Sequence, residues 1–314
     1  LGIFRPRADS WPTSESRKMV GADVAGSDGI TGKGVKVAVL DTGIDPLGPQ
    51  SLGSTGESHV AGEPWFFDVN GHGTHTSTTL AGPARPTPRG SLCLGVAPGA
   101  DLIHLKVMGS LVGTGPFSDV MAGMQRALEL GADVVSMSLG GDDTAEPDSP
   151  EHRVVRLLVE QGIVVVAAAG NLGPGKATIG SPGSAPDALT VGAVDRNGQV
   201  SDFSSRGPTM LGLVKPDCVA PGREILSATT GLIAAMEFLE GPPWGSLSGT
   251  SMATPHVAGA VALGIEYARS RGKTLAITHI KDALARYGHS KDSETGWGLL
   301  MYPMLKRYVD EALP

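Results

Sequence analysis

The chain has 314 residues, a hydrophobic fraction of 40% and a formal net charge of −7 at pH 7. This composition is typical of a globular protein with a large core, and the acidic balance argues against nucleic acid as the main partner. No apolar run is long enough to span a membrane as a helix. The 45 glycines follow no period, which excludes a collagen-like chain and predicts many tight turns.

Residues 1–20 show no apolar periodicity, so the sequence predicts an extended N-terminal arm there. After the arm, β-branched apolar runs typical of buried parallel strands alternate with segments typical of helices. The strands are expected at 35–41, 102–108, 133–139, 163–170 and 188–194, and the helices near 72–81, 117–130, 151–161, 251–268 and 275–287. This alternation predicts an α/β fold, a three-layer doubly wound sheet, mostly parallel, with helices on both faces. No long linker divides residues 21–314, which are expected to form a single domain.

Polar residues follow three of the predicted strands. Asp41 comes at the end of "VKVAVLD", Ser138 lies in "SMSLGG", and Asn171 follows "VVVAAAG". In doubly wound sheets the active groups gather beyond the carboxyl ends of the strands. We therefore expect these three side chains to lie near one site.

The stretch "SLSGTSMATPHVAGAVAL" places Ser251 at the start of a predicted helix. An ordinary capping serine is one interpretation. However, Pro255 lacks the N–H that would bond to the carbonyl of Ser251, and Gly249 leaves room for a close approach. A serine exposed in this way is a candidate nucleophile, provided that a base and an acid are supplied from elsewhere.

The segment "NGHGTHTSTTLAG" supplies a candidate base, because His72 stands between two glycines at a predicted helix start. Asp41 is a candidate partner that would accept a hydrogen bond from one ring nitrogen and stabilise the charged imidazole. His75 lies one turn after His72, but the pair lacks the glutamate of the HExxH zinc pattern. The candidate catalytic residues then occur along the chain in the order Asp41, His72 and Ser251.

Four segments, "VAVLDTGID", "HGTHTSTTLAG", "AAAGN" and "SGTSMATPHVAG", resemble the signature segments of the subtilisin-like serine proteases, the subtilases. The similarity covers about residues 28–300. The resemblance implies a subtilisin-like catalytic domain over residues 21–314 and a serine endopeptidase. Asp41 would orient His72, His72 would act as general base and then acid, and Ser251 would form an acyl-enzyme. Asn171 and the backbone N–H of Ser251 would bind the oxyanion.

The resemblance also implies a substrate cleft in which an extended peptide pairs with backbone segments on two sides. The expected segments are Ser138, Leu139 and Gly140 on one side and Gly113, Thr114 and Gly115 on the other. The first specificity pocket would be lined by Ala168, Ala169, Gly170 and Gly180, and the next by Phe117 and Leu139. With a glycine at its base and no charge identified nearby, the first pocket is expected to prefer large apolar residues before the cut. The acidic residues Asp142, Asp143, Glu146 and Asp148 are interpreted as a solvated face, or as a bias toward basic residues at outer subsites.

The chemistry implied by the resemblance needs no cofactor, although subtilases commonly hold structural calcium. The sequence has Gln50 where the family has a calcium-binding aspartate, and "PARPTPRGSLCLG" where it has an Asn-rich loop. The usual strong calcium site is therefore expected to be absent, while weaker sites made by backbone carbonyls stay open. Cys93 and Cys218 form either one disulfide or two thiols, and two thiols are favoured.

The family resemblance implies polypeptide substrates, an inhibitory pro-segment before maturation and a monomeric enzyme. The chain begins with leucine, which is consistent with a matured, secreted or extracytoplasmic enzyme, with an intracellular location as the alternative. Two competing functions are a peptide-binding pseudo-protease and an esterase of the α/β-hydrolase type. The complete Asp–His–Ser set argues against the first, and the absence of a GxSxG elbow argues against the second.

Overall fold

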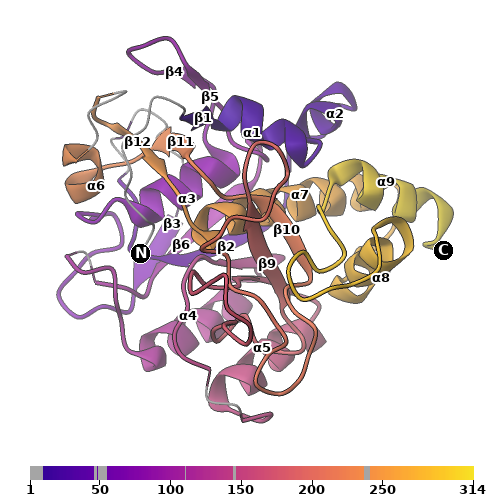
Figure 1. The fold of residues 1–314 in the computed structure, drawn as a ribbon. Coiled ribbons are helices and arrows are strands. Elements are labelled where there is room, and N and C mark those ends of the chain that lie inside the picture. The colour runs from indigo at the N-terminus through magenta and orange to yellow at the C-terminus, as the bar shows by residue number, and fades with distance from the viewer. Residues whose placement is uncertain (1–9, 46–47, 49–54, 110, 144–145, 237–240) are drawn as a thin grey trace.

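The computed structural model describes residues 10–45, 48, 55–109, 111–143, 146–236 and 241–314. Among these residues, seven strands form one sheet in the order β10-β9-β8-β7-β2-β6-β3, and every neighbouring pair is parallel (Figure 1). The strands are β2 (Lys36–Asp41), β3 (Thr55–Ser58), β6 (Asp101–Lys106), β7 (Val134–Met137), β8 (Val164–Ala168), β9 (Leu189–Val194) and β10 (Cys218–Pro221). The predicted doubly wound α/β fold is confirmed.

Successive residues of the central strands point to opposite faces of the sheet, and both faces are buried. In β2, Val37 and Val39 join one core cluster, and Ala38 and Leu40 join the other. The first cluster is covered by α2 (Ala22–Ser27), α3 (His72–Ala81), α7 (Thr250–Ser270), α8 (Ile277–Tyr287) and α9 (Tyr302–Glu311). The second is covered by α4 (Phe117–Glu129) and α5 (Pro150–Glu160), which lie together on the other side of the sheet (Figure 1).

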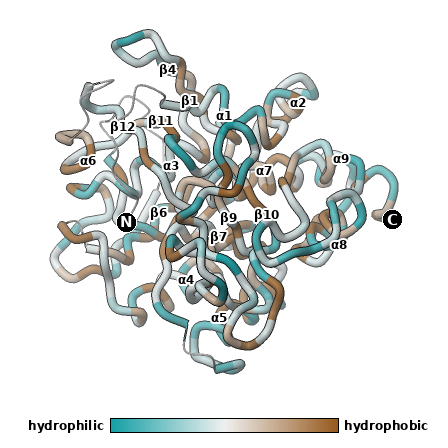
Figure 2. Tube along the Cα trace, in the orientation of Figure 1, coloured by the Kyte–Doolittle hydropathy of each residue, from teal (hydrophilic) through white to brown (hydrophobic). Residues whose placement is uncertain are grey.

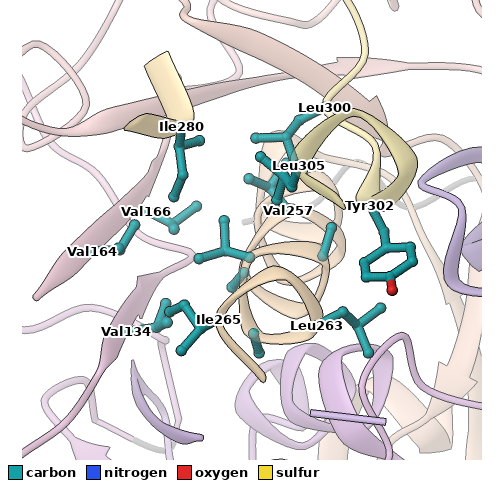
Figure 3. Close-up of a cluster of buried hydrophobic side chains, with 14 of the residues drawn as sticks. Val134, Val164, Val166, Val257, Leu263, Ile265, Ile280, Leu300, Tyr302 and Leu305 are labelled. Carbon is teal, nitrogen blue, oxygen red and sulfur yellow. The ribbon is translucent and has the colours of Figure 1, made fainter. Parts of the chain in front are cut away.

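Helix α7 runs through the middle of the first cluster and is buried along almost its whole length. Its side chains Val257 and Ile265 pack near the valines of β7 and β8 (Figure 3). A Cβ atom at Gly259 would lie only 2.6 Å from the Cβ of Val96, so glycine permits the close approach of neighbouring backbone here. Figure 2 shows that hydrophilic residues gather on the outer loops rather than along this central helix. A rigidly packed helix thus carries Ser251 at its first turn.

The extended arm predicted for residues 1–20 is wrong over its second half. Residues 13–19 form helix α1 (Thr13–Met19), preceded by the short strand β1 (Trp11–Pro12). Strand β1 joins a second sheet with β11 (Ile225–Ala228) and β12 (Trp244–Leu247), next to which lies the short helix α6 (Gly231–Ala235). The division of the chain at residue 20 stays a prediction.

Helix α1 has no apolar periodicity, and polar side chains hold it in place. The Ser14 hydroxyl donates to the Leu92 carbonyl at 2.6 Å, and Arg17 Nε donates to the Gly95 carbonyl at 2.9 Å. These acceptors lie in and after the hairpin of β4 (Arg85–Pro86) and β5 (Leu92–Cys93). A search for hydrophobic periodicity misses a helix that is fixed in this way.

The two cysteines are thiols rather than a disulfide, as the sequence favoured. Cys93 lies in β5, where its Sγ is 3.5 Å from the Leu226 carbonyl oxygen, whereas Cys218 lies in β10 within the first core cluster. Burial raises the pKa of the Cys218 thiol. Within the described ranges, no helix combines the length and apolar character that crossing a membrane requires.

Candidate active site

The candidate site lies where three adjacent strands end and two helices begin. Asp41 ends β2, Ser138 follows β7 and Asn171 follows β8, and these strands are neighbours in the sheet order β8-β7-β2. His72 is the first residue of α3, and Ser251 is the second residue of α7. The carboxyl edge of a parallel sheet therefore gathers the predicted groups, as the topology requires.

Asp41 and His72 form a buried pair, with 2.7 Å between Asp41 Oδ1 and His72 Nδ1. A carboxylate only accepts, so Nδ1 carries the proton and Nε2 is left as the acceptor. The backbone N–H of Thr42 also donates to Asp41 Oδ1 at 2.7 Å, and the Thr76 hydroxyl donates to Oδ2 at 3.1 Å. Both carboxylate oxygens are thus fixed, and the imidazole has the tautomer that a general base needs.

Asp68 links the segment after Asp41 to the start of α3. Its Oδ1 accepts from the Thr42 hydroxyl and the Gly71 N–H, both at 2.9 Å, and its Oδ2 accepts from the Thr74 N–H at 2.8 Å and hydroxyl at 2.6 Å. Burial raises the pKa of this carboxyl, and the four hydrogen bonds oppose that rise. Asp68 therefore fixes the segment that leads into His72.

Two glycines allow His72 to lie between tightly packed backbone segments. Gly71 has φ of 94°, in the left-handed region, and a Cβ there would overlap the Thr230 carbonyl oxygen. A Cβ at Gly73 would overlap the Gly43 carbonyl oxygen. The pattern Gly-His-Gly is therefore a packing requirement of this helix start.

The side chain of Asn171 is oriented by the first residue of α7. The Thr250 N–H and hydroxyl both donate to Asn171 Oδ1, at 2.9 and 3.1 Å. Because the amide oxygen is occupied, Nδ2 is the group left to donate toward a ligand. A Cβ at Gly249 would lie 3.3 Å from this Nδ2, so glycine keeps the space beside the amide open.

Ser251 makes two hydrogen bonds with Ser138. Its Oγ donates to the Ser138 carbonyl at 3.0 Å, and the Ser138 hydroxyl donates to the Ser251 carbonyl at 2.8 Å. Among the described residues, no hydrogen bond joins Ser251 Oγ to His72. Because Ser251 lies in the first turn of α7, its backbone N–H has no acceptor within the helix.

A cavity of about 630 Å³ brings most of the predicted site together. The predicted residues that line it are His72, Gly113, Ser138, Leu139, Gly140, Ala168, Ala169, Gly170, Asn171, Gly180 and Ser251. Asp41 contacts His72 but is not among the residues that line the cavity. Thr114, Gly115 and Phe117 do not line it, and both Phe117 and Leu139 pack against the second core cluster.

Residues 32–298 of the chain match the subtilase family. The chain belongs to the subtilase family. It is 39% identical over 281 residues to Subtilisin Savinase from Lederbergia lenta, which covers 90% of this chain and 94% of that protein. It is also 39% identical over 258 residues to Serine protease AprX from Bacillus subtilis, covering 74% of this chain and 57% of AprX.

A third relative is the Intracellular serine protease from Paenibacillus polymyxa, 39% identical over 242 residues, which cover 74% of this chain and 67% of that protein. The relatives are named as subtilisins and serine proteases. The chain is accordingly a serine-type endopeptidase, a hydrolase that acts on polypeptides.

The cavity of this subtilase also contains residues that sequence reasoning missed. They are Thr42, Met108, Gly141, Leu172, Ala177, Thr178, Ile179, Met210 and Thr250. The cavity is also lined by Asp142 and Asp143, which the sequence analysis interpreted as a solvated face or as a bias toward basic residues at outer subsites. Leu172 and Met210 are 69% and 61% exposed, so the cavity has an apolar rim from two separate loops. Leu172 directly follows Asn171 in the sequence, which is a usable signal, whereas nothing in the sequence marks Met210.

The premise that nothing near the first specificity pocket is charged is wrong. Asp142 and Asp143 line the same cavity, because the chain after Gly140 stays beside it. Gly141 is held there by two backbone hydrogen bonds with Ser181, and Asp143 Oδ1 accepts from the Ser184 hydroxyl at 3.1 Å. Asp142 lies between these two anchored residues with its side chain exposed.

The other buried histidines near the site of the subtilase are structural. Burial lowers the pKa of His75 to about 3, and its Nε2 donates to the carbonyls of Ile225 and Gly245. Burial likewise lowers the pKa of His256 to about 4. Within the part of the chain that the structure describes, no three His, Cys, Asp or Glu side chains gather as a metal centre. Gln50 lies outside the described residues, so the calcium expectation stays a prediction.

Proposed function

We propose that this subtilase cleaves peptide bonds through an acyl-enzyme on Ser251. His72 Nε2 takes the proton of Ser251 Oγ as Oγ bonds to the scissile carbonyl carbon, and the imidazolium then protonates the leaving amine. Water repeats the sequence on the acyl-enzyme, releasing the acid and restoring Ser251. The observation that carries the proposal is the 2.7 Å bond from His72 to Asp41, made by an imidazole that shares a cavity with Ser251.

The oxyanion that forms on the carbonyl carbon needs fixed donors. Asn171 Nδ2 and the Ser251 backbone N–H would supply them, because Thr250 occupies Asn171 Oδ1 and helix geometry leaves the Ser251 N–H without an intrahelical acceptor. No cofactor is required for this chemistry, since the chain itself supplies the base, nucleophile and donors.

Substrate binding in this proposal is by strand addition of an extended peptide beside Ser138–Gly140, with Gly113 across the cavity. The residue before the cut enters the pocket of Ala168, Ala169 and Gly180, which favours large apolar side chains. The exposed Leu172 and Met210 extend the apolar surface at its rim.

Labelling with a fluorophosphonate probe tests the catalytic assignment. We expect one adduct at Ser251 by peptide mapping, and no adduct in the Ser251→Ala and His72→Ala variants. Hydrolysis of casein together with labelling supports the endopeptidase, and ester turnover without casein hydrolysis supports an esterase. An intact fold without labelling or hydrolysis supports a peptide-binding pseudo-protease.

We also propose a monomeric, exported enzyme that matures by loss of an inhibitory pro-segment. Support comes from the family resemblance, while the relative named as intracellular gives the alternative. Fractionation of the cells that make the protein, with N-terminal sequencing and sedimentation of the mature form, distinguishes the two.

We further propose that the strong calcium site of the family is absent. The hairpin of β4 and β5 occupies the segment expected for the Asn-rich loop, and arginine and proline side chains stand in it. Calcium prefers six to eight oxygen ligands. We expect Tm to stay the same when a chelator is added, and a fall that added calcium reverses would contradict the proposal.

A further inference from the structure

Pro255 leaves a gap in the hydrogen bonding of helix α7. In a regular helix the N–H of residue 255 would donate to the carbonyl of residue 251, and proline has no N–H. The carbonyl that loses its donor belongs to Ser251, the proposed nucleophile. A buried carbonyl without a donor destabilises the fold, so a partner is expected.

The Ser138 hydroxyl is that partner. It donates to the Ser251 carbonyl at 2.8 Å, and its own residue is only 3% exposed. The Ser251 hydroxyl returns a hydrogen bond to the Ser138 carbonyl at 3.0 Å. Two hydrogen bonds therefore tie the end of β7 to the first turn of α7.

The neighbouring carbonyls of this turn find their side-chain donors within α7 itself. The Thr254 hydroxyl donates to the Thr250 carbonyl at 2.9 Å, and His256 Nδ1 donates to the Met252 carbonyl at 2.8 Å. The Ser251 carbonyl instead takes its donor from Ser138, which follows β7 and lies 113 residues earlier in the chain. Proline thus replaces a local helix bond by a long-range one at the proposed nucleophile.

We propose that Ser138 is a positioning residue for Ser251, in addition to the substrate pairing expected of its backbone. Its hydroxyl replaces the N–H that Pro255 lacks and fixes where the first turn of α7 lies relative to the end of β7. This inference rests on the proposed function only in taking Ser251 as the nucleophile. A displacement of the nucleophile by about 1 Å is enough to lower kcat substantially.

A double-mutant cycle tests the proposal by restoring the backbone N–H that Pro255 lacks. Ser138→Ala leaves the Ser251 carbonyl without a donor, and we expect kcat to fall about tenfold or more with KM within about twofold. Pro255→Ala restores an N–H one turn along the helix. We therefore expect Pro255→Ala to raise kcat several-fold in the Ser138→Ala background, and not in the wild-type background.

Ser136→Ala is the matched control, since Ser136 is 2% exposed and lies in β7, two residues before Ser138. Ser136→Ala should leave kcat within about twofold of wild type. Adding Pro255→Ala to the Ser136→Ala variant should not raise kcat. If Ser138→Ala does not fold, the isosteric pair Ser138→Thr and Ser138→Val separates the hydroxyl from volume. We expect Thr to keep kcat close to wild type and Val to lower it.

The rate of fluorophosphonate labelling at Ser251, measured beside Tm, separates positioning from stability. A lower labelling rate in the fully folded Ser138→Ala or Ser138→Val variant supports positioning. Wild-type kcat in those variants, a loss of Tm alone, or effects of Ser138→Ala and Pro255→Ala that simply add would overturn it. Absence of labelling in the wild-type protein would instead refute the proposed function.

Discussion

The starts of α3 and α7 both present a proposed catalytic side chain, but they are held in different ways. His72 is fixed by the segment around it, because its partner Asp41 lies 31 residues away and Asp68 binds Gly71 and Thr74 on either side of it. Ser251 is fixed by distant strands, since Ser138 lies 113 residues earlier. Its neighbour Thr250 binds Asn171, 79 residues earlier.

The α3 half of the site therefore depends on a local polar network, and the α7 half depends on the assembled sheet. The α3 start is held by the Asp68 carboxylate, which accepts four hydrogen bonds. The α7 start is held by single hydroxyl and amide groups at the ends of β7 and β8. Substitutions in the two places should therefore change different measured quantities.

The largest effect on stability is expected away from both helix starts, at Asp217. Burial raises the pKa of Asp217, and the charges of Lys215, Lys281 and Lys291 outweigh this and hold it well below its usual range. Its carboxylate pairs with Lys215 at 2.5 Å and with Lys291 at 2.8 Å. Asp217→Asn should lower the free energy of unfolding by about 3–5 kcal/mol at pH 7, because buried lysine charge loses its partner.

The pH dependence of the Asp217 effect follows from the lowered pKa. The ionised carboxylate contributes stability above its unfolded pKa, about 4, and this is lost as the pH falls toward the folded pKa. Urea titrations should show that the difference in the free energy of unfolding between wild type and Asp217→Asn becomes smaller below about pH 4. The kcat of the folded variant should stay unchanged. A changed kcat would show that the two helix starts are coupled to this buried cluster.

Asn171→Ala tests the α7 half directly. It removes the proposed oxyanion donor and the acceptor of the Thr250 N–H, and kcat should fall about 10²–10³-fold with KM little changed. Steady-state kinetics with one peptide substrate measures both constants. Asn197→Ala, an exposed turn substitution, is the control, and an unaltered kcat in Asn171→Ala would remove Asn171 from the proposed oxyanion site.

Asp68→Asn tests the α3 half. An amide offers one acceptor oxygen in place of two, so two of the four hydrogen bonds are lost. The free energy of unfolding should therefore fall by about 1–3 kcal/mol. Labelling of Ser251 should slow as His72 loses its alignment. Asp101→Asn, at the opposite end of the sheet, should change neither, and equal effects of both variants would contradict a role of Asp68 at this helix start.

The smallest effect is expected at Asp142, on the charged wall of the cavity. Asp142→Asn should lower kcat/KM for peptides with lysine before the cut about two- to fivefold relative to leucine peptides, because an exposed ion pair contributes up to about 1 kcal/mol. High salt should remove the difference. Glu146→Gln, an exposed change on the same loop outside the cavity, is the control. If the ratio of kcat/KM for lysine peptides to kcat/KM for leucine peptides does not change, Asp142 has no influence on specificity.

The predicted elements agree with the structure where burial produces a periodic pattern. Helix α3 has the predicted bounds 72–81, and β2 lies within its predicted run. Helix α1 was missed because polar contacts rather than an apolar stripe hold it. Phe117 does not line the cavity, whereas Leu139, which packs against the same core cluster, does, so the second specificity pocket stays a prediction.

The amino-acid sequence alone determined the family, the layered fold and the chemical groups of the site. Apolar periodicity and distinctive residue patterns need no knowledge of distant contacts, which is why these features could be deduced. Only the tertiary structure decided that Ser138 supplies the donor missing at Pro255 and that Asp142 shares a cavity with Ser251. Hydrogen bonds act over about 3 Å and depend on direction, so their partners are settled only when distant segments pack together.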